Sequence, residues 1–177
     1  MVVTSLSPRV AAALQETAFT YSEVGATADS LPAGYATFTR TRTLPDAELD
    51  HAGELLMAWQ AHERAGLRVA ASSKRAEAGA VVLMRLGIGR VSIRIPCRVV
   101  YVIDEPNRMG FAYGTLPGHP VAGEELFLVQ RNGGGRVTFT VSAFSRPATT
   151  LTRVAGPVTR WAQSRMMDRY PRALNRP

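Results

Sequence analysis

The sequence predicts one α+β domain in which a curved antiparallel sheet surrounds a long C-terminal helix. The length of 177 residues is that of a single domain. Between about residues 67 and 145, strand signals recur roughly every 10 to 15 residues, with turn residues between them. The final segment, about 148–173, instead has apolar residues at helical spacing, with Gly156-Pro157 expected to kink it.

The first 34 residues predict an N-terminal helical extension. Ser7 can cap a helix and Pro8 suits its first turn, whereas Pro32 and Gly34 interrupt the chain. Residues 35–42 alternate between threonine and other side chains, which predicts the first strand.

A single helix is expected next, at about residues 45–64. Leu55, Leu56 and Trp59 recur at helical spacing, and Gly66 is a typical residue to end the helix.

Six further strands are expected at 67–72, 79–87, 90–103, 108–117, 124–131 and 135–145. The third alternates, so that Cys97 and Tyr101 share an apolar face and Arg94 and Arg98 lie on the solvated face. In the other strands, aromatic residues occupy the alternate positions that face the same side of the sheet, which predicts a concave apolar face.

This order of elements matches the helix-grip fold, with a seven-stranded antiparallel sheet wrapped around a long C-terminal helix and an internal cavity between them. The whole chain, residues 1–177, is expected to form that one domain. The residues expected to line a ligand in the cavity are Tyr101, Phe111, Tyr113, Phe127, Phe139 and Trp161.

Composition restricts the class of protein and its partners. Apolar residues make up 46% of the chain, and no run approaches the roughly 18 apolar residues that cross a membrane. The N-terminus lacks the pattern of a secretory signal, which predicts a cytoplasmic protein. The one cysteine, Cys97, excludes an internal disulfide.

The sequence predicts neither a metal site nor a cofactor. His51 and His62 share the predicted helix but are about 16 Å apart along its axis at 1.5 Å per residue. The glycine run at 131–136 lacks the Lys-Ser/Thr ending of a phosphate loop and is better explained as a hairpin turn.

The net charge of +7 makes an anionic partner worth testing. Arg165, Arg169 and Arg172 share one face of the predicted C-terminal helix and could contact nucleic acid. Nucleic-acid binding is not expected, however, because Trp161 and Tyr170 are predicted to face inward and a solvated arginine face is the simpler interpretation.

The polar candidates for chemistry lie in or beside the loop at 116–125. His119 could turn back toward Glu124 or Glu125, and such a pair would raise the histidine pKa and could act as a general base. Tyr113, on the cavity face, could orient a ligand oxygen. The alternative is structural: a glutamate that binds loop amides, a histidine that stabilises the turn and a tyrosine that belongs to the core.

Several stretches together resemble a known family. The segment GFAYGTLPGHPVAGEE at 110–125 is the most specific of them, and TYSEVGAT at 20–27, PCRVVYV at 96–102 and FSRPA at 144–148 agree with it. The chain thus resembles domain-of-unknown-function family number nineteen-ninety, which is found in bacteria and plants. That family resembles the superfamily of START domains and birch-pollen-allergen-like proteins. The resemblance implies a helix-grip fold that commonly holds apolar ligands, and it carries no catalytic role for any residue.

Three functions follow as hypotheses. The first is binding of a hydrophobic small molecule in the internal cavity. The second is an enzyme of cyclase, dehydratase or isomerase type that uses Tyr113, His119 and a glutamate. The third is an anion- or RNA-binding module that uses the basic C-terminal helix.

Overall fold

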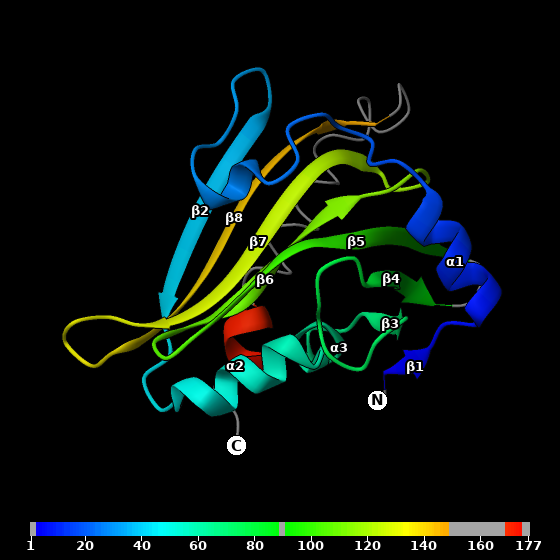
Figure 1. Cartoon of the computed structure of the whole chain (residues 1–177). Helices are drawn as coiled ribbons and strands as arrows, with labels where there is room; N and C mark the ends of the chain where they lie inside the picture. Colours follow the sequence, from blue (N-terminus) through cyan, green and yellow to red (C-terminus); the bar gives the residue numbers. More distant parts are fainter. Residues whose placement is uncertain (1–2, 89–90, 149–168, 175–177) are drawn as a thin grey trace.

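The computed structural model describes residues 3–88, 91–148 and 169–174. An eight-stranded sheet forms its main layer, in the order β1-β3-β4-β5-β6-β7-β8-β2 (Figure 1). The strands are β1 (Thr4–Ser5), β2 (Ala36–Thr43), β3 (Arg68–Ala71), β4 (Val81–Ile88), β5 (Val91–Glu105), β6 (Arg108–Thr115), β7 (Val121–Arg131) and β8 (Val137–Pro147). The helices are α1 (Pro8–Glu16), a 3₁₀ turn η1 (Ala26–Ala28), α2 (Leu49–Met57) and α3 (Gln60–Arg64), and residues 169–174 are also helical.

The seven strands from β2 to β8 are the seven expected from the sequence, and they pair antiparallel with one another. The sheet is nevertheless mixed, because β1 adds an eighth strand that runs parallel to β3. The two residues of β1 are exposed and too few to show alternation, so the sequence carries no signal for them.

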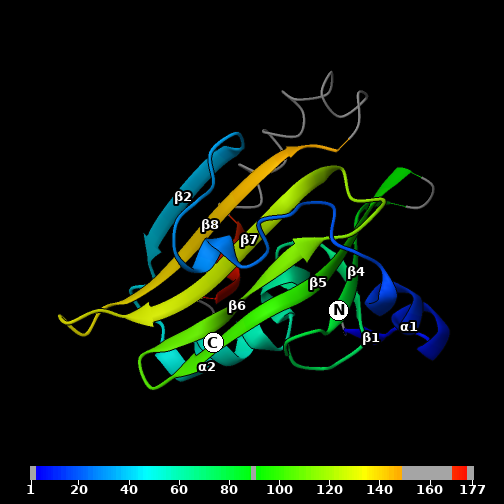
Figure 2. The ribbon, with the colours of Figure 1, turned by 45° about the horizontal axis from the view of Figure 1, so that its top comes forward.

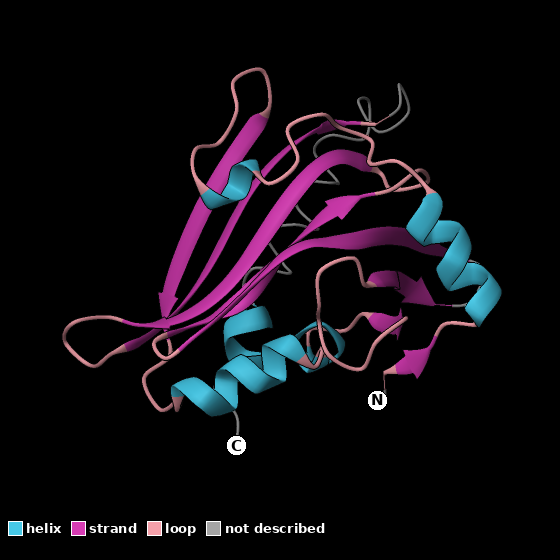
Figure 3. Cartoon of the chain, viewed as in Figure 1, coloured by secondary structure: helices cyan, strands magenta, loops and turns pink. Residues whose placement is uncertain are grey.

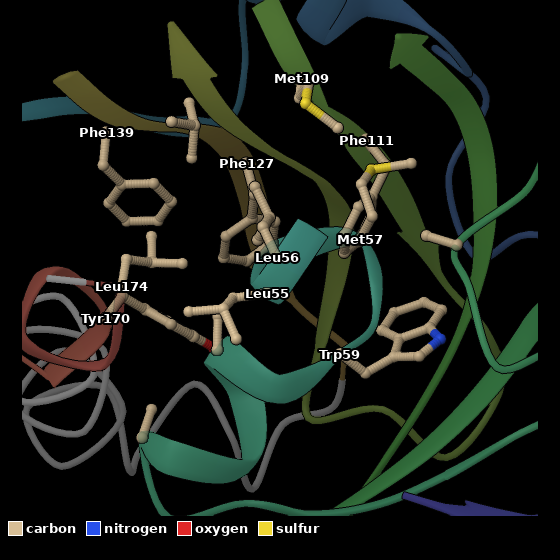
Figure 4. Packing of buried hydrophobic residues seen from close by; sticks show 14 of the residues in the cluster. Leu55, Leu56, Met57, Trp59, Met109, Phe111, Phe127, Phe139, Tyr170 and Leu174 are labelled. Carbon is tan, nitrogen blue, oxygen red and sulfur yellow. The ribbon is translucent and has the colours of Figure 1, made fainter. Parts of the chain in front are cut away.

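Helices α2 and 169–174 lie on the same side of the sheet, and the long strands bend over them (Figures 2 and 3). Leu55 and Leu56 of α2 are buried against aromatic side chains of the sheet such as Phe111 and Phe127 (Figure 4). This face therefore holds the main core, as the alternation of the strands predicts.

The predicted helix at 45–64 is two helices, because the chain breaks at Trp59. Trp59 adopts a left-handed backbone conformation, with φ 64°. That conformation is disfavoured for a bulky residue, typically by about 1–3 kcal/mol. Its indole is fully buried and donates a hydrogen bond to the Ser73 carbonyl (3.2 Å), which offsets that strain.

Tyr101 was expected on the concave face and lies on the opposite one. The register of β5 against β6 shifts between Val99 and Tyr101, so that Val99 faces Tyr113 and Tyr101 faces Ala112. This bulge reverses the side-chain direction of every later residue in β5. The Tyr101 ring packs with the small cluster on the outer face.

The outer face also carries α1 and the segment that follows it. Arg98, expected to be solvated, donates a hydrogen bond to the Thr17 carbonyl (3.0 Å) and stacks over the Phe19 ring, 4.2 Å from its centroid. The N-terminal segment is therefore fastened to the sheet.

Most of the predicted helix at 148–173 lies outside the described residues, as do Trp161 and Arg165. Within the described part, Tyr170 and Leu174 pack into the core. Arg169, predicted to be on the solvated face, donates a hydrogen bond to the Ala65 carbonyl (3.1 Å). In the described part of the chain no helix has both the length and the apolar content needed to cross a membrane.

Candidate ligand-binding site

The polar centre of the concave face is a pair formed by Tyr113 of β6 and Glu125 of β7. The two residues are direct cross-strand partners, so their side chains share one face. The Tyr113 hydroxyl donates a hydrogen bond to Glu125 Oε2 (3.1 Å). Tyr113 is buried, whereas Glu125 retains some accessible surface. The sequence analysis placed Tyr113 on this face but offered Glu125 only as a possible partner of His119, so the pairing of Tyr113 with Glu125 was not expected.

Burial dominates the electrostatics of this pair. It raises the pKa of Glu125 to about 7, and the hydrogen bond from Tyr113 offsets part of that rise. Burial also raises the pKa of Tyr113 and of Tyr170 well above the ordinary tyrosine value, and the charge of Glu125 raises both further. The carboxyl group therefore changes its protonation near neutral pH, while both phenols stay protonated.

His62 of α3 lies in the same region, although the sequence analysis placed it only on the predicted helix at 45–64 and gave it no functional role. Its side chain is fully buried, and neither ring nitrogen has a hydrogen-bond partner among the residues that the structure describes. Burial lowers the pKa of His62 to about 3, so the imidazole is neutral. Five aromatic rings surround it at centroid distances of 4.9–6.0 Å, those of Trp59, Phe111, Tyr113, Phe127 and Tyr170.

The other residues expected to line the ligand divide into three groups. Phe111, Phe127 and Phe139 lie on the concave face and are buried together (Figure 4). Tyr101 lies on the outer face, because of the bulge in β5. Trp161 lies outside the described residues.

Glu124 faces the outer side of the sheet and holds the N-terminal segment. Its carboxylate accepts hydrogen bonds from the Tyr21 hydroxyl (2.7 Å) and the Gly25 amide (2.7 Å). It also accepts hydrogen bonds from the amide (3.0 Å) and the hydroxyl of Thr27. Glu124 is almost fully buried, so these bonds replace the water that the carboxylate has lost. This geometry matches the structural alternative, a glutamate that binds loop amides.

His119 bonds within its own loop. Its Nδ1 lies 3.1 Å from the Val121 amide nitrogen and 2.9 Å from the Val121 carbonyl oxygen. Burial lowers the pKa of His119 to about 4, although the bond with the Val121 backbone acts in the opposite direction. The expected pair with Glu124 or Glu125 is not formed, because those carboxylates bond to other groups, and the expected rise in the histidine pKa is wrong.

The site therefore combines an aromatic wall with three polar groups, those of Glu125, Tyr113 and His62. Cys97 is also buried on this side of the sheet, and burial raises its pKa well above the ordinary thiol value, which disfavours the reactive thiolate. Within the described residues, no group of three His, Cys, Asp or Glu side chains is placed to hold a metal ion.

The curved mixed sheet with helices on its concave face defines an α+β fold of the START and birch-pollen-allergen-like class. Solved structures with this fold include the hypothetical protein jhp0584 of Helicobacter pylori (TM-score 0.59, 9% identity, covering 80% of this chain and 88% of that one). Human STARD10 is also similar (TM-score 0.53, 10% identity, 78% and 62% covered). So is major latex-like protein 151 of Panax ginseng (TM-score 0.50, 12% identity, 80% and 95% covered). At these identities the similarity defines the fold alone.

The chain belongs to the family Domain of unknown function (DUF1990), whose model matches residues 20–173. A UPF0548 protein of Deinococcus radiodurans is 52% identical over 79 residues, 45% of this chain and 40% of the relative. A UPF0548 protein of Arabidopsis thaliana is 35% identical over 77 residues, 40% of this chain and 38% of the relative. The matched part is thus about two fifths of each curated relative.

Proposed function

We propose that this protein binds a hydrophobic small molecule between the concave face of the sheet and the C-terminal helix. In this proposal the aromatic residues of the sheet contact the apolar part of the ligand, and Tyr113 and Glu125 contact its polar end. The helix predicted at 148–173 would form the opposite wall of the cavity.

The observation that carries the proposal is the position of Glu125. Protein atoms surround its carboxyl group closely enough to raise its pKa to about 7, yet the residue keeps accessible surface. Both properties are expected of a side chain that lines an enclosed space and not of one inside a close-packed core. Strongly shifted pKa values also concentrate at functional sites.

The surroundings of Glu125 support an apolar ligand. Phe111, Phe127 and Phe139 are buried in contact with one another on the same face, so the surroundings of the carboxyl group are apolar, and apolar surroundings with a few polar groups are typical of small-molecule sites. The superfamily that the chain resembles commonly holds apolar ligands, which agrees with this composition.

The test is a titration with N-phenyl-1-naphthylamine, an uncharged apolar dye that fluoresces when bound. Ala143 is the cross-strand partner of Glu125 on β8 and is buried on the same face. Ala143→Phe should fill the proposed space and abolish dye binding while the protein stays folded. Ser142→Phe, one residue away on the opposite face, is the matched control and should bind the dye like the wild type.

Two results would contradict the proposal. One is a wild-type protein that does not bind the dye. The other is an Ala143→Phe variant that unfolds, because a phenyl ring inserted into a packed core is destabilising and one inserted into a cavity is tolerated. Native mass spectrometry of the purified protein would add the mass of any molecule that co-purifies.

A second candidate function is an enzyme of cyclase, dehydratase or isomerase type that acts in the same space. The favouring observation is again Glu125, since a carboxyl group with a pKa of about 7 suits proton transfer at neutral pH. If the protein is such an enzyme, Glu125→Gln should bind the co-purifying molecule without converting it. A cytoplasmic location and the absence of a nucleic-acid partner stay predictions from the sequence.

A further inference from the structure

Three arginines lie side by side on the outer face of the sheet, near the end of the hairpin formed by β4 and β5. Arg68 of β3 is the direct cross-strand partner of Arg85 of β4, which is in turn the partner of Arg94 of β5. Direct partners share a face and neighbouring strands are about 4.8 Å apart, so the three side chains form one row. All three are exposed, and Arg68 donates a hydrogen bond to the Gly87 carbonyl (3.3 Å), which directs its side chain toward the end of the hairpin.

The described carboxylates do not neutralise this row, which consists of Arg68, Arg85 and Arg94. The chain has 14 Asp and Glu residues, and all but Asp168 lie in the described part. The ion pairs among them are made with other arginines, Arg75 and Arg108. Like charges directly opposite one another on a sheet are destabilising. A partner that carries phosphate groups would therefore stabilise the row.

The concave side of the same hairpin is apolar and leaves the core toward its end. Met84 and Cys97 are buried, whereas Leu86 is only partly buried and Ile93 is 51% exposed. Leu86 and Ile93 are direct cross-strand partners, so the pair offers an accessible aliphatic surface. Helix α1 contacts both strands at this end of the sheet and adds the exposed Val10 (Figure 1).

The spacing along the hairpin suits a membrane surface. The last backbone pair of β4 and β5 is Ile88 with Val91. At about 3.4 Å per residue, Ile93 lies about 7 Å from that pair and the arginine row about 10 Å from it. Segments that bind at a membrane interface bury apolar side chains about 5–10 Å deep. At that depth Leu86 and Ile93 meet the acyl boundary, while the long arginine side chains reach the lipid phosphates.

We propose that the end of the β4–β5 hairpin docks on a membrane that contains anionic lipids, with the row of arginines bound to lipid phosphates. Nucleic acid also carries phosphates, but its backbone offers no apolar layer for Leu86 and Ile93. A lipid surface matches both sides of the hairpin. This inference goes beyond the proposed function and is independent of it, because docking does not require a ligand on the concave face.

The test is co-sedimentation of the full chain with two kinds of vesicle. One kind is phosphatidylcholine alone, and the other contains about 30% phosphatidylglycerol. The protein should bind the mixed vesicles and not phosphatidylcholine alone, because the row requires anionic headgroups. Raising the NaCl concentration from about 0.1 M to about 0.5 M should weaken the binding, because salt screens the charges.

The first variant, Arg68→Gln/Arg85→Gln/Arg94→Gln, removes the row. Each basic side chain close to an anionic membrane strengthens binding about fivefold, so this variant should bind the mixed vesicles about 100-fold more weakly. Arg85→Gln alone removes the centre of the row and should weaken binding about fivefold. All three positions are exposed, so the fold should be retained.

The matched control is Arg40→Gln/Arg42→Gln/Arg136→Gln. It removes the same charge from exposed arginines of β2 and of the residue before β8, at the opposite edge of the sheet. Its binding to the mixed vesicles should stay within about twofold of the wild type, because charges farther from the membrane than the screening length contribute little.

A second pair of variants tests the apolar side of the hairpin. Ile93→Ser should weaken binding to the mixed vesicles by up to about tenfold, because the aliphatic side chain no longer enters the acyl boundary. Val24→Ser is the control, since Val24 is 47% exposed but belongs to the N-terminal segment. Ile93→Cys labelled with the dye NBD should brighten on the mixed vesicles, and Cys97 is fully buried and so escapes labelling in the folded protein.

Four results would overturn the proposal: no binding of the wild type to the mixed vesicles, equal binding to both kinds, equal loss of binding in the arginine control, or wild-type binding by Ile93→Ser. Tighter binding to a DNA duplex than to the mixed vesicles, lost with the row and unchanged in Ile93→Ser, would replace the membrane by nucleic acid. If the triple variant does not fold, Arg85→Gln carries the same comparison. Binding of N-phenyl-1-naphthylamine, measured without vesicles, should be unchanged in the row variants, so the proposed function is tested separately.

Discussion

Replacement of Glu124 by alanine is expected to detach the N-terminal segment from the outer face of the sheet. The carboxylate accepts hydrogen bonds from Tyr21, Gly25 and Thr27, which bring a segment about 100 positions earlier in the sequence onto β7. Without the carboxylate, three or more donors at this buried contact lose their acceptor. Each unsatisfied buried donor costs roughly 1–3 kcal/mol, so the free energy of unfolding should fall by about 3 kcal/mol or more.

Urea unfolding measures that loss, and hydrogen exchange locates it. In Glu124→Ala the amides of Gly25 and Thr27 should exchange much faster than in the wild type, because their acceptor is gone. Tyr21→Phe removes one donor and leaves the carboxylate its other partners, so its effect should be smaller. Glu16→Ala changes an exposed glutamate at the end of α1 and serves as the control.

The reasoning would be refuted if Glu124→Ala lost less than about 1 kcal/mol and the amides of Gly25 and Thr27 stayed protected. That result would mean that the apolar contacts of the segment hold it without the carboxylate. Tyr21 packs edge-on against Phe144, with ring centroids 5.5 Å apart, and is the contact that would then carry the attachment.

Three further variants test other parts of the structure. Folding raises the pKa of Glu125 from 4.5 to about 7, so between these pH values the wild type takes up a proton when it folds. The free energy of unfolding of the wild type, compared with that of Glu125→Gln, should therefore fall by about 3 kcal/mol as pH rises from 4.5 through 7. Urea unfolding at each pH measures this fall. His119→Ala should lower the free energy of unfolding by about 1 kcal/mol, because its hydrogen bond with the Val121 backbone is lost, and the folded variant should still bind the dye. Loss of dye binding with an unchanged free energy of unfolding would instead indicate a functional role for His119. Gly114→Ala would place a methyl group 2.2 Å from the Tyr21 hydroxyl oxygen. The amides of the N-terminal segment should therefore exchange their hydrogens faster, as in Glu124→Ala. Amide hydrogen exchange at the wild-type rate would contradict the close contact.

Strands such as β3 and β8 were predictable because one face of each is more deeply buried than the other, and this burial imposes an alternation that the sequence displays directly. The prediction failed where alternation is absent. Residues 99–103 of β5 read Val-Val-Tyr-Val-Ile, so no polar residue marks the bulge that turns Tyr101 outward. The break at Trp59 is equally hidden, since apolar residues recur at helical spacing on both sides of it and the left-handed backbone leaves no mark in the sequence.

The site was predictable in part. Tyr113 and Glu125 share the parity of Phe111 and Phe127, which is enough to place them on the concave face. His62 carries no comparable signal, because a lone histidine on a helix is usually exposed or satisfied. Its burial among five aromatic rings, and the lack of a hydrogen-bond partner for either nitrogen within the described part of the chain, become visible only in three dimensions. That the chain forms one domain over its whole length stays a prediction.

The consecutive glutamates of the Gly-Glu-Glu sequence at 123–125 differ in role because adjacent residues of a strand face opposite sides of the sheet. Glu124 turns outward and is satisfied by four hydrogen bonds from the N-terminal segment, so its charge is compensated within the protein. Glu125 turns inward and, among the described residues, receives one hydrogen bond, from Tyr113, so its charge is compensated far less. Stability alone does not account for an inward carboxyl group, since a glutamine would fill the same volume without the cost of burying a charge. The inward glutamate is therefore the one on which the proposed ligand binding rests, and the outward glutamate explains why residues 20–27 and 110–125, far apart in the chain, meet in one structure.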